Sequence, residues 1–503
     1  MSNRDLDELR NCFNRLKIKE NVPTALNEIK SILAYKPAAE AAPTIRNIGI
    51  SKILYCINTS TKSEAELACD VLKICFDKFE PGEAIRCYIS HFMYLLRHER
   101  DCVRRLAVDE VYKAITSNVN VLPLPQYIDV YVAVAQMICD VDIGIANKAV
   151  LITSNLPTEA YPKVLEEMKI ALDCNNSAKC NAYEVVMNIS SKSYDLFQLC
   201  AQERYIDFMV NELNSDDILY QLNILELLSQ LAVKSHGINY LVKQGMLQKI
   251  ADQVKELHSN PFGSLLTPGY MKFFGYIAYN YPKEIFGKYP ILLETLFEAL
   301  DSNDSNLLPV AIDTLGFIGT TNEGKMCLAT LGSKYTQNIE RLGSIIRNSP
   351  SELRIRALRC MGNLISVDKD PNSKVESVDQ RITLMTREWF RILSKQPSSM
   401  EVLYGICKNP FPDIKLAGLI LLDAACQHQW GEESVARVAG FIEYLLDRTT
   451  DFNKECNEAK YDIIKRLASS TAFDEAIIIR LQKYVELGPF HSETTLEVAM
   501  DGE

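Results

Sequence analysis

The segment GTTNEGK, residues 319–325, comes closest to a nucleotide-binding motif in this chain. It fits the first seven positions of GxxxxGK[ST], in which backbone amides and the lysine hold phosphates and the final hydroxyl binds Mg²⁺. The eighth residue here is Met326, which has no hydroxyl, and the segment follows a helical pattern rather than a strand. We therefore interpret the segment as a turn between helices and expect no ATP site.

Other residue types that could do chemistry form no recognisable site. His91 and His98 lie seven residues apart, without the cysteine or carboxylate pattern that accompanies a zinc site. Cys426 and His428 lie close together, but no third group is visible that would orient the histidine as a base. GxSxG and HExxH motifs are also missing from the sequence. We expect no catalytic, cofactor-binding or metal-binding residues, no cofactor and no enzymatic activity.

The charge and the cysteines narrow the class of protein. The 503 residues carry a formal net charge of −11, which disfavours nucleic acid or an anionic membrane as the main partner. The 15 cysteines are scattered singly, as small apolar side chains are in a reducing compartment. The first residues show no apolar signal segment, and no apolar run is long enough to cross a bilayer. We expect a protein of the cytoplasm or the nucleus.

The elements that position these residues have a helical pattern almost throughout, because apolar residues recur at steps of three and four. The chain is too long for one hydrophobic core, so we searched it for repeats. Residues 223–245 superpose on residues 310–332 after a shift of 87, with Gly237 and Gly245 falling on Gly324 and Gly332. Two armadillo or HEAT units of about 40–47 residues each account for this shift.

A second pattern places an acid or serine, then a basic residue, then a small residue at matching positions of several helices. Arg104, Arg354 and Lys415 match one another, as do Ala107, Ala357 and Gly418. In HEAT units the small residue lets adjacent helices approach, and the acid and the base can pair between layers. Around the two arginines lie the basic clusters 100–105 and 354–359. Each cluster has two interpretations, pairing between repeats or capture of an acidic partner.

The stretch NPFGSLLTPGYMKFFGYIA, residues 260–278, combines prolines and glycines with aromatic residues. We predict a loop over 259–269 and a helix that follows Pro268-Gly269 and turns Tyr270, Phe273 and Phe274 into the core. Gly275 within that helix would let a neighbour or partner come close. The loop is the part that repeat packing does not require, and it is therefore a candidate partner contact.

Four stretches now carry a family resemblance: 260–278, VAIDTLGFIGTTNEGK (310–325), NPFPDIKLAGL (409–419) and 440–468. They resemble the 26S proteasome non-ATPase regulatory subunit 5 family, the proteasome base assembly chaperones. The likeness is ordered along the C-terminal two thirds of the chain. The first 200 residues resemble the family only in their helical repeat character.

The resemblance implies a chaperone for assembly of the base of the 26S proteasome regulatory particle. Such a chaperone would bind the C-terminal domain of a proteasomal AAA-ATPase subunit and hold it with associated base subunits until release. It would be a monomer within a hetero-complex, with neither nucleic acid nor membrane as partner. The alternative is another HEAT or armadillo interaction scaffold or a transport adaptor, although Trp389 and Trp430 lack the register of an importin-like tryptophan ladder.

We accordingly predict an all-α, HEAT/armadillo-like solenoid of roughly 10–12 repeats over residues 1–487. A polar loop lies near 366–380, and residues 488–503 form a flexible acidic tail. The stacked second helices of the repeats would line the binding groove. As partner-binding residues we select Lys272, Phe273, Arg354 and Arg356, because no short motif transfers contacts from the family. For each the alternative is core packing or pairing between repeats, and this applies to Phe273 more than to Lys272.

Overall fold

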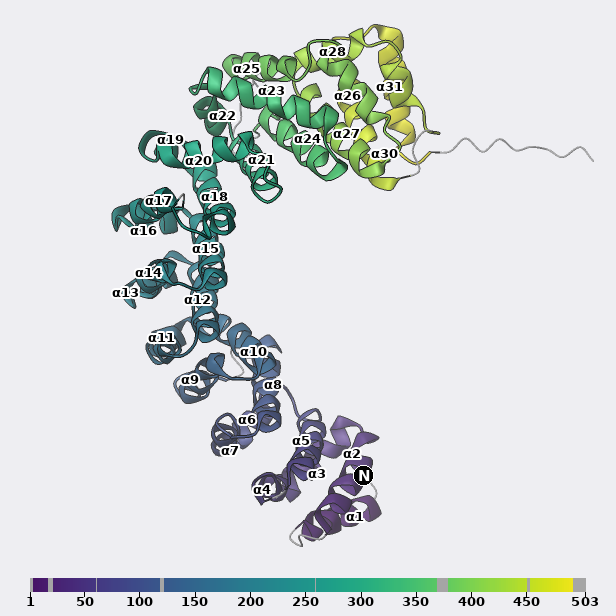
Figure 1. The fold of residues 1–503 in the computed structure, drawn as a ribbon. Coiled ribbons are helices and arrows are strands. Elements are labelled where there is room, and N and C mark those ends of the chain that lie inside the picture. Colours follow the sequence, from purple (N-terminus) through teal and green to yellow (C-terminus); the bar gives the residue numbers. More distant parts are fainter. Residues whose placement is uncertain are drawn as a thin grey trace, which may run out of the picture. The chain divides into compact units, whose positions relative to one another are not determined.

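The computed structural model describes residues 3–16, 21–59, 61–117, 122–257, 259–368, 379–449 and 453–491. These residues form α-helices and short 3-10 helices and include no strand (Figure 1). Among them, no helix is both long and apolar enough to cross a bilayer. The fold is therefore the all-α, armadillo/HEAT-like class that the sequence pattern predicted.

The chain divides into two compact units, Met1–Leu231 and Ala232–Glu503. The single solenoid over residues 1–487, with roughly 10–12 repeats, stays a prediction. The polar loop expected near 366–380 lies mostly outside the described residues, as does the tail expected over 488–503. All 15 cysteines are thiols, and most of them are buried.

Unit 1 is built of short helices that alternate between two layers. One layer follows the contacts of α2 with α5, α5 with α8, α8 with α10 and α10 with α12, and the other includes α7, α9 and α11. The helices of the unit are α1 (Asn3–Arg15), α2 (Val22–Ala34), α3 (Ala38–Ile48), α4 (Ser51–Thr59), α5 (Lys62–Phe76), α6 (Glu83–Cys87), α7 (Ile89–Leu95), α8 (Asp101–Ser117), α9 (Ile128–Gln136), η3 (Met137–Cys139), α10 (Ile143–Ser154), η4 (Thr158–Ala160), α11 (Tyr161–Met168), η5 (Lys169–Asp173), α12 (Asn176–Ser190), α13 (Tyr194–Gln202), α14 (Tyr205–Asn211), η6 (Glu212–Asn214) and α15 (Ile218–Ala232).

Unit 2 repeats a set of three helices. The third helices pack in succession, α18 on α21, α21 on α24, α24 on α27 and α27 on α30 (Figure 1). The first helices α19, α22 and α25 and the second helices α17, α20 and α23 pack in succession beside them. The helices of the unit are α16 (Ser235–Lys243), α17 (Met246–Glu256), α18 (Gly263–Asn280), α19 (Pro282–Lys288), α20 (Pro290–Asp301), α21 (Leu307–Ile318), α22 (Asn322–Ala329), α23 (Ser333–Asn348), α24 (Ser351–Ile365), α25 (Gln380–Ile392), α26 (Ser399–Cys407), α27 (Pro412–Cys426), α28 (Gln429–Arg437), α29 (Phe441–Leu446), α30 (Lys454–Leu467) and α31 (Glu475–Leu487).

The 87-residue shift corresponds to two of these three-helix repeats. It carries α15 onto α21 and α16 onto α22, and the matched apolar positions of α15 and α21 are buried in both. Gly245 and Gly332 both adopt positive φ, 65° and 59°, where the chain turns into the next helix. The continuous layer of unit 2 therefore consists of third helices, whereas a two-helix repeat would have formed it from second helices.

Side-chain caps define many of the turns between helices. Asp142, Asn175 and Ser193 each accept a hydrogen bond from a backbone N–H in the first turn of α10, α12 and α13. Thr61 with Glu64 and Ser398 with Glu401 form capping boxes at α5 and α26. These polar caps satisfy N–H groups that the helices leave free, and so they set where each helix begins.

The stretch 260–278 differs from the prediction. Helix α18 begins at Gly263 and contains Pro268, so the expected loop over 259–269 is wrong. A Cβ on Gly263 would lie 2.0 Å from the Leu257 carbonyl oxygen, and only glycine allows the chain to turn so tightly there. Pro268 lies near the start of the helix, and the residue whose carbonyl it leaves unpaired, Ser264, is exposed to water.

Small residues bring the third helices close together, as expected. A Cβ on Gly275 of α18 would lie 2.8 Å from Thr314 Cγ2 of α21, and one on Gly316 of α21 would lie 2.9 Å from Cys360 Cα of α24. Tyr270, Phe273 and Phe274 are buried, as predicted. The neighbour that approaches Gly275 is therefore the next third helix.

Candidate partner-binding surface

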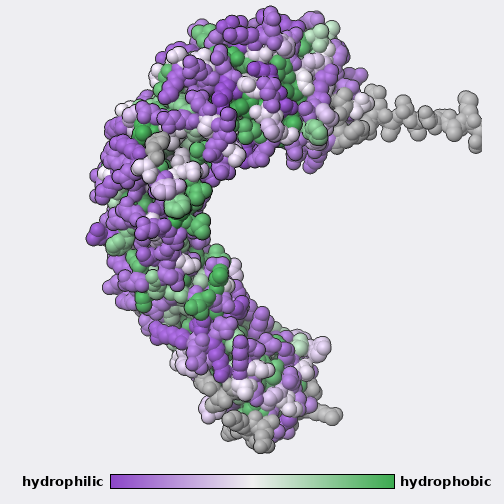
Figure 2. Space-filling view, viewed as in Figure 1, coloured by the Kyte–Doolittle hydropathy of each residue, from purple (hydrophilic) through white to green (hydrophobic). Residues whose placement is uncertain are grey.

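The third helices α18, α21 and α24 share a face that leaves polar and aromatic side chains partly accessible. Positions spaced by three and four residues on each helix share this face. We call it the α18–α24 face and define it by Lys272, Tyr276, Tyr279, Asp313, Phe317, Arg356 and Arg359. Hydrophobic residues reach the surface in patches among a mostly hydrophilic covering (Figure 2).

Three cations surround Asp313 on this face. Arg356 forms an ion pair with Asp313 through Nη1, and its Nη2 lies 3.2 Å from Glu352 Oε1. Loss of water around the Asp313 carboxyl raises its pKa, whereas the charges of Arg356, Arg359 and Lys272 act to lower it. Two of the four predicted residues, Lys272 and Arg356, are thus within electrostatic range of one carboxylate.

Two cations of this cluster keep their charge available. Lys272 and Arg359 are both exposed, and neither forms an ion pair with any described residue. Arg356, in contrast, forms ion pairs with the carboxylates of Asp313 and Glu352. A partner that brings a carboxylate to this face would therefore meet Lys272 and Arg359 first.

An aromatic trio completes the face. The Phe317 ring of α21 stacks on Tyr279 of α18 at a centroid distance of 4.4 Å and meets Tyr276 edge-on at 5.2 Å. All three rings are only partly buried. Tyr276 and Tyr279 are absent from the predicted partner-binding residues, although they follow Lys272 at steps of four and three residues, the spacing that places residues on one helix face.

The other two predicted residues lie elsewhere. Phe273 is fully buried and packs edge-on against Phe274 at 5.0 Å, so it serves the core and offers no surface to a partner. Arg354 donates from Nη2 to the Arg347 carbonyl at 3.0 Å, which ties α24 to the last turn of α23. For these two residues the structure favours packing and pairing within the fold.

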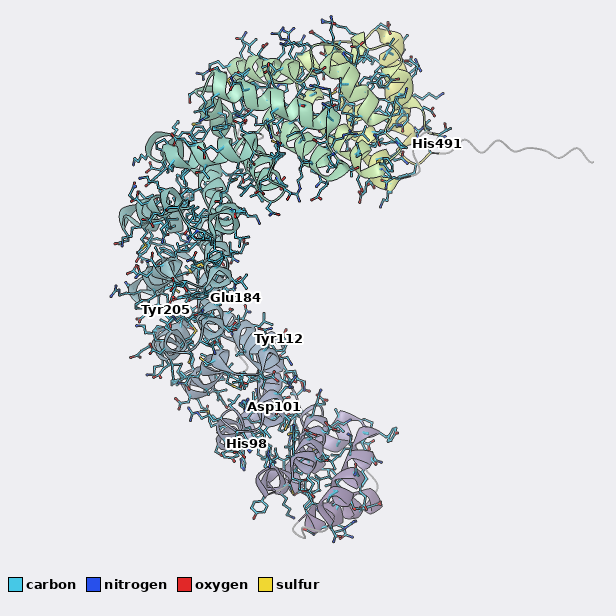
Figure 3. All side chains as sticks on the ribbon, in the orientation of Figure 1. His98, Asp101, Tyr112, Glu184, Tyr205 and His491 are labelled. Carbon is cyan, nitrogen blue, oxygen red and sulfur yellow. The ribbon has the colours of Figure 1, made fainter. Side chains whose placement is uncertain are left out.

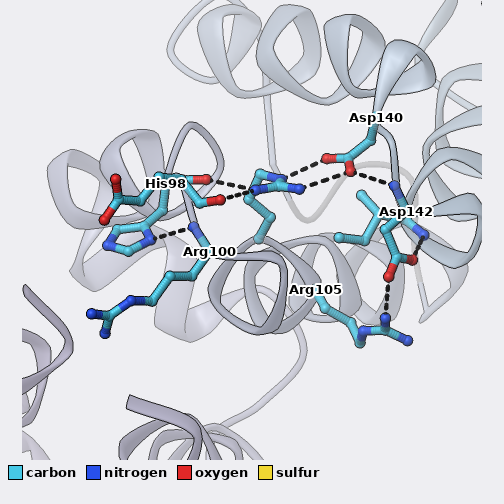
Figure 4. Close-up of polar contacts among 8 residues, drawn as sticks. His98, Arg100, Arg105, Asp140 and Asp142 are labelled. Carbon is cyan, nitrogen blue, oxygen red and sulfur yellow. Dashed lines mark hydrogen bonds and ion pairs between the residues drawn. The ribbon is translucent and has the colours of Figure 1, made fainter. Parts of the chain in front are cut away.

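The basic cluster 100–105 is used in contacts between repeats (Figure 4). Arg104 binds both carboxylate oxygens of Asp140, at 2.6 and 2.8 Å, and donates to the carbonyls of His98 and Glu99. Arg105 pairs with Asp142, the N-cap of α10. Arg104 therefore resembles Arg354 in binding carbonyls that follow or end the preceding helix. Pairing between repeats is the better interpretation of this cluster.

Residues 319–325, which resemble a phosphate loop, form the turn that leads into α22 and the start of that helix. Thr321 caps α22 by accepting the Gly324 N–H at 3.0 Å, and Lys325 donates to the Thr320 carbonyl at 2.9 Å. Lys325 is fully buried, and burial lowers its pKa to about 8 against the opposing charge of Asp368. Lys325 stands where the motif has its phosphate-binding lysine, but here its amine binds a carbonyl of the same turn.

The remaining chemical candidates are also structural. His98 is buried and accepts the Arg100 N–H on Nδ1, and His428 contacts the Ile365 carbonyl and stacks on Trp430. Burial raises the pKa of the Cys426 thiol, which disfavours a nucleophilic thiolate. The described residues contain no group of three or more potential metal ligands. Trp389 and Trp430 are both largely buried, Trp389 beneath Tyr335 and Trp430 beside Phe390.

The comparisons with known proteins agree in one family. A sequence model described as "Proteasome non-ATPase 26S subunit" matches residues 4–503. The human protein "26S proteasome non-ATPase regulatory subunit 5" is 26% identical over 489 residues, which cover 95% of each chain. The Drosophila melanogaster protein of the same name is 26% identical over 502 residues, 97% of each chain.

Two solved structures, one of an engineered protein and one of a designed armadillo repeat protein, are also similar in part. An engineered protein covers 93% of this chain and 99% of its own at 16% identity, with a TM-score of 0.36. A designed armadillo repeat protein covers 55% of this chain and 98% of its own at 15% identity, with a TM-score of 0.33. Since the family match extends over nearly every residue, this chain belongs to the proteasome non-ATPase 26S subunit family.

Proposed function

We propose that this chain is an assembly chaperone for the base of the proteasome regulatory particle. It binds the C-terminal domain of a proteasomal AAA-ATPase subunit and holds a precursor with associated base subunits until release. The observation that carries the proposal is the family match over residues 4–503, with relatives named as non-ATPase regulatory subunits of the 26S proteasome. A location in the cytoplasm or nucleus and the lack of enzymatic activity remain predictions.

We assign the contact to the α18–α24 face. Tyrosine and arginine contribute most often to the energetic centres of protein interfaces, and this face combines them with a lysine. The Tyr276–Tyr279–Phe317 trio offers preformed apolar area, and Lys272 and Arg359 offer positive charge that forms no ion pair with a described residue. A folded domain with an apolar centre and acidic side chains beside it fits this chemistry.

The chaperone would act only by covering a surface of the domain that it binds. A folded domain held on this face would have part of its own surface covered, so that a later assembly partner could not dock there until the chaperone left. The buried Lys325 of the phosphate-loop resemblance contributes nothing to such a cycle. Binding and release therefore time the assembly without nucleotide hydrolysis by this chain.

The test is binding of the purified full chain to each isolated proteasomal ATPase C-terminal domain. We expect one domain to bind, and the variant Lys272→Glu/Arg359→Glu to weaken that binding about 30–150-fold, since each reversed charge costs roughly 1–1.5 kcal/mol. The matched control is Lys243→Glu/Lys249→Glu, which changes the net charge equally at exposed positions on α16 and α17.

Two results would count against the proposal. If no domain binds, the chaperone function is wrong. If the face variant and the control weaken binding equally, the α18–α24 face is not the contact. Circular dichroism of each variant verifies that the helices remain folded.

A further inference from the structure

A pocket of about 580 Å³ lies in unit 2, away from the third-helix layer. The last turns of α25, the residues that lead into α26, and α28 form its walls. Its volume lies within the usual range of ligand pockets, about 300–1,000 Å³. The proposed binding of an ATPase domain does not use this pocket.

The rim of the pocket is strongly basic. Arg387, Arg391, Lys395 and Arg437 line it, against Glu401 as the carboxylate. Glu401 is already engaged, because it accepts the Ser398 N–H at 2.7 Å in the capping box of α26. In a chain with a net charge of −11, this group of cations fits an anionic ligand.

Two of the four cations are unpaired among the described residues. Arg391 and Arg437 form ion pairs with Glu388 and Glu433 of their own helices, at 2.8 and 3.5 Å. These pairs are exposed and therefore weak. Arg387 and Lys395 are exposed and form no ion pair with any residue that the structure describes. An incoming carboxylate could bind both without breaking an existing contact.

The pocket also has an apolar wall. Phe390 and Trp430 are 5% and 7% exposed, and their ring centroids are 5.3 Å apart. The Trp430 indole N–H has no hydrogen-bond partner among the described residues. A small inorganic anion would leave this wall uncovered, whereas a peptide with acidic and apolar side chains would use both the rim and the wall.

The chain itself contains such a peptide. Residues 492–503, SETTLEVAMDGE, interleave Glu493, Glu497 and Asp501 with Leu496, Val498 and Met500. They have no basic residue, so their charge is opposite to that of the rim. His491, the last described residue, lies beside α30 and α31 (Figure 3).

The segment is long enough to reach the pocket. Arg448, just beyond α29, donates to the Gly488 and Tyr484 carbonyls at 2.6 and 3.1 Å and so fixes the end of α31 there. Helix α29 has six residues, about 9 Å in length, and its N-cap Gly440 follows Val438 of the pocket by two residues. Twelve extended residues span up to about 40 Å, well beyond that separation.

We propose that this pocket binds the chain's own acidic segment, residues 492–503. Its apolar side chains lie against Phe390 and Trp430, and its carboxylates pair with Arg387 and Lys395. The segment thereby neutralises the basic rim of the pocket, and a competing acidic peptide would have to displace it. This inference is independent of the proposed chaperone function, and its tests require no proteasome subunit.

The first test is zero-length cross-linking of the full chain with a carbodiimide, which joins a lysine amine to a carboxylate. We expect a Lys395–Glu497 or Lys395–Asp501 amide within single chains, at least about fivefold more abundant than cross-links of Lys483 to the same carboxylates. Lys483 is an exposed lysine of α31, nearer in sequence, and serves as the matched control. Equal yields, or cross-links that isotope mixing assigns to two chains, overturn the proposal.

The second test uses a synthetic peptide of residues 492–503 and a chain shortened after His491. We expect the shortened chain to bind the peptide at least tenfold more tightly than the full chain, whose own segment competes. Arg387→Glu/Lys395→Glu in the shortened chain should weaken binding at least tenfold, whereas Lys243→Glu/Lys249→Glu should not. Equal binding by the full and shortened chains, or no binding by either, overturns the proposal.

Discussion

The Arg104–Asp140 pair provides a sharp test of how the repeats of unit 1 hold together. The two side chains are 13% and 5% exposed, and Arg104 makes two bonds to the carboxylate and two to backbone carbonyls. Removing one partner of a buried pair costs about 3–5 kcal/mol, because the other charge stays buried alone. In the Arg104→Met variant, Asp140 still accepts a hydrogen bond from the Asp142 N–H at 2.9 Å. We therefore expect Arg104→Met to lower the free energy of unfolding by about 3 kcal/mol, the lower end of that range.

The matched variant is Arg105→Met on the same helix. Its pair with Asp142 is more exposed, with 49% of the arginine side chain accessible, and exposed pairs contribute about 0–1 kcal/mol. Urea unfolding followed by circular dichroism gives the free energy of unfolding of each variant. Hydrogen exchange of Arg104→Met should show the loss of protection in α8 and α10. Adding Asp140→Asn to Arg104→Met should recover at least about 1 kcal/mol, because no unpaired charge remains. Equal losses of stability in the two arginine variants would contradict a buried role for the Arg104–Asp140 pair.

Three further outcomes follow. Gly316→Ala should destabilise the chain by about 1–2 kcal/mol, because the new methyl group crowds the Cys360 backbone. This cost outweighs the roughly 1 kcal/mol by which alanine favours a helix over glycine. A stabilised variant would contradict this expectation. Gly405→Ala, in open space on α26, should instead stabilise by about 0.5–1 kcal/mol in the same urea titration, and any loss would contradict this. Burial lowers the pKa of Lys325 to about 8, so its amine loses its proton at lower pH in the folded than in the unfolded chain. The free energy of unfolding, measured relative to Lys325→Met, should therefore rise by about 3 kcal/mol between pH 8 and 10.5. A difference that does not change with pH would show that Lys325 is solvated.

The repeat character was predictable because it depends on local spacing. Apolar steps of three and four residues and glycines at the turns recur with the period of the fold, so the 87-residue shift identified two repeats correctly. The start of α18 was not predictable, because Pro268 near a helix start is tolerated only where the freed carbonyl meets water. That exposure depends on packing that the local pattern does not contain.

The candidate surface was only partly predictable for a similar reason. Lys272 and Arg356 belong to different repeats, and only packing of α18, α21 and α24 brings them to Asp313. The sequence pattern could not separate Arg104, which is buried in a pair, from Arg359, which is free of ion pairs with the described residues. Neighbouring helices decide which charge is neutralised, and they come from distant parts of the sequence.

The assignment of the partner to the α18–α24 face is tested most directly by hydrogen exchange and cross-linking of the bound complex. Because a regular helix exchanges slowly on its own, the decisive readout is the set of cross-links between this chain and the ATPase C-terminal domain. We expect cross-links from Lys272 and reduced exchange in α18, α21 and α24 on binding. Cross-links confined to the first and second helices, with unchanged exchange in these three, would contradict it.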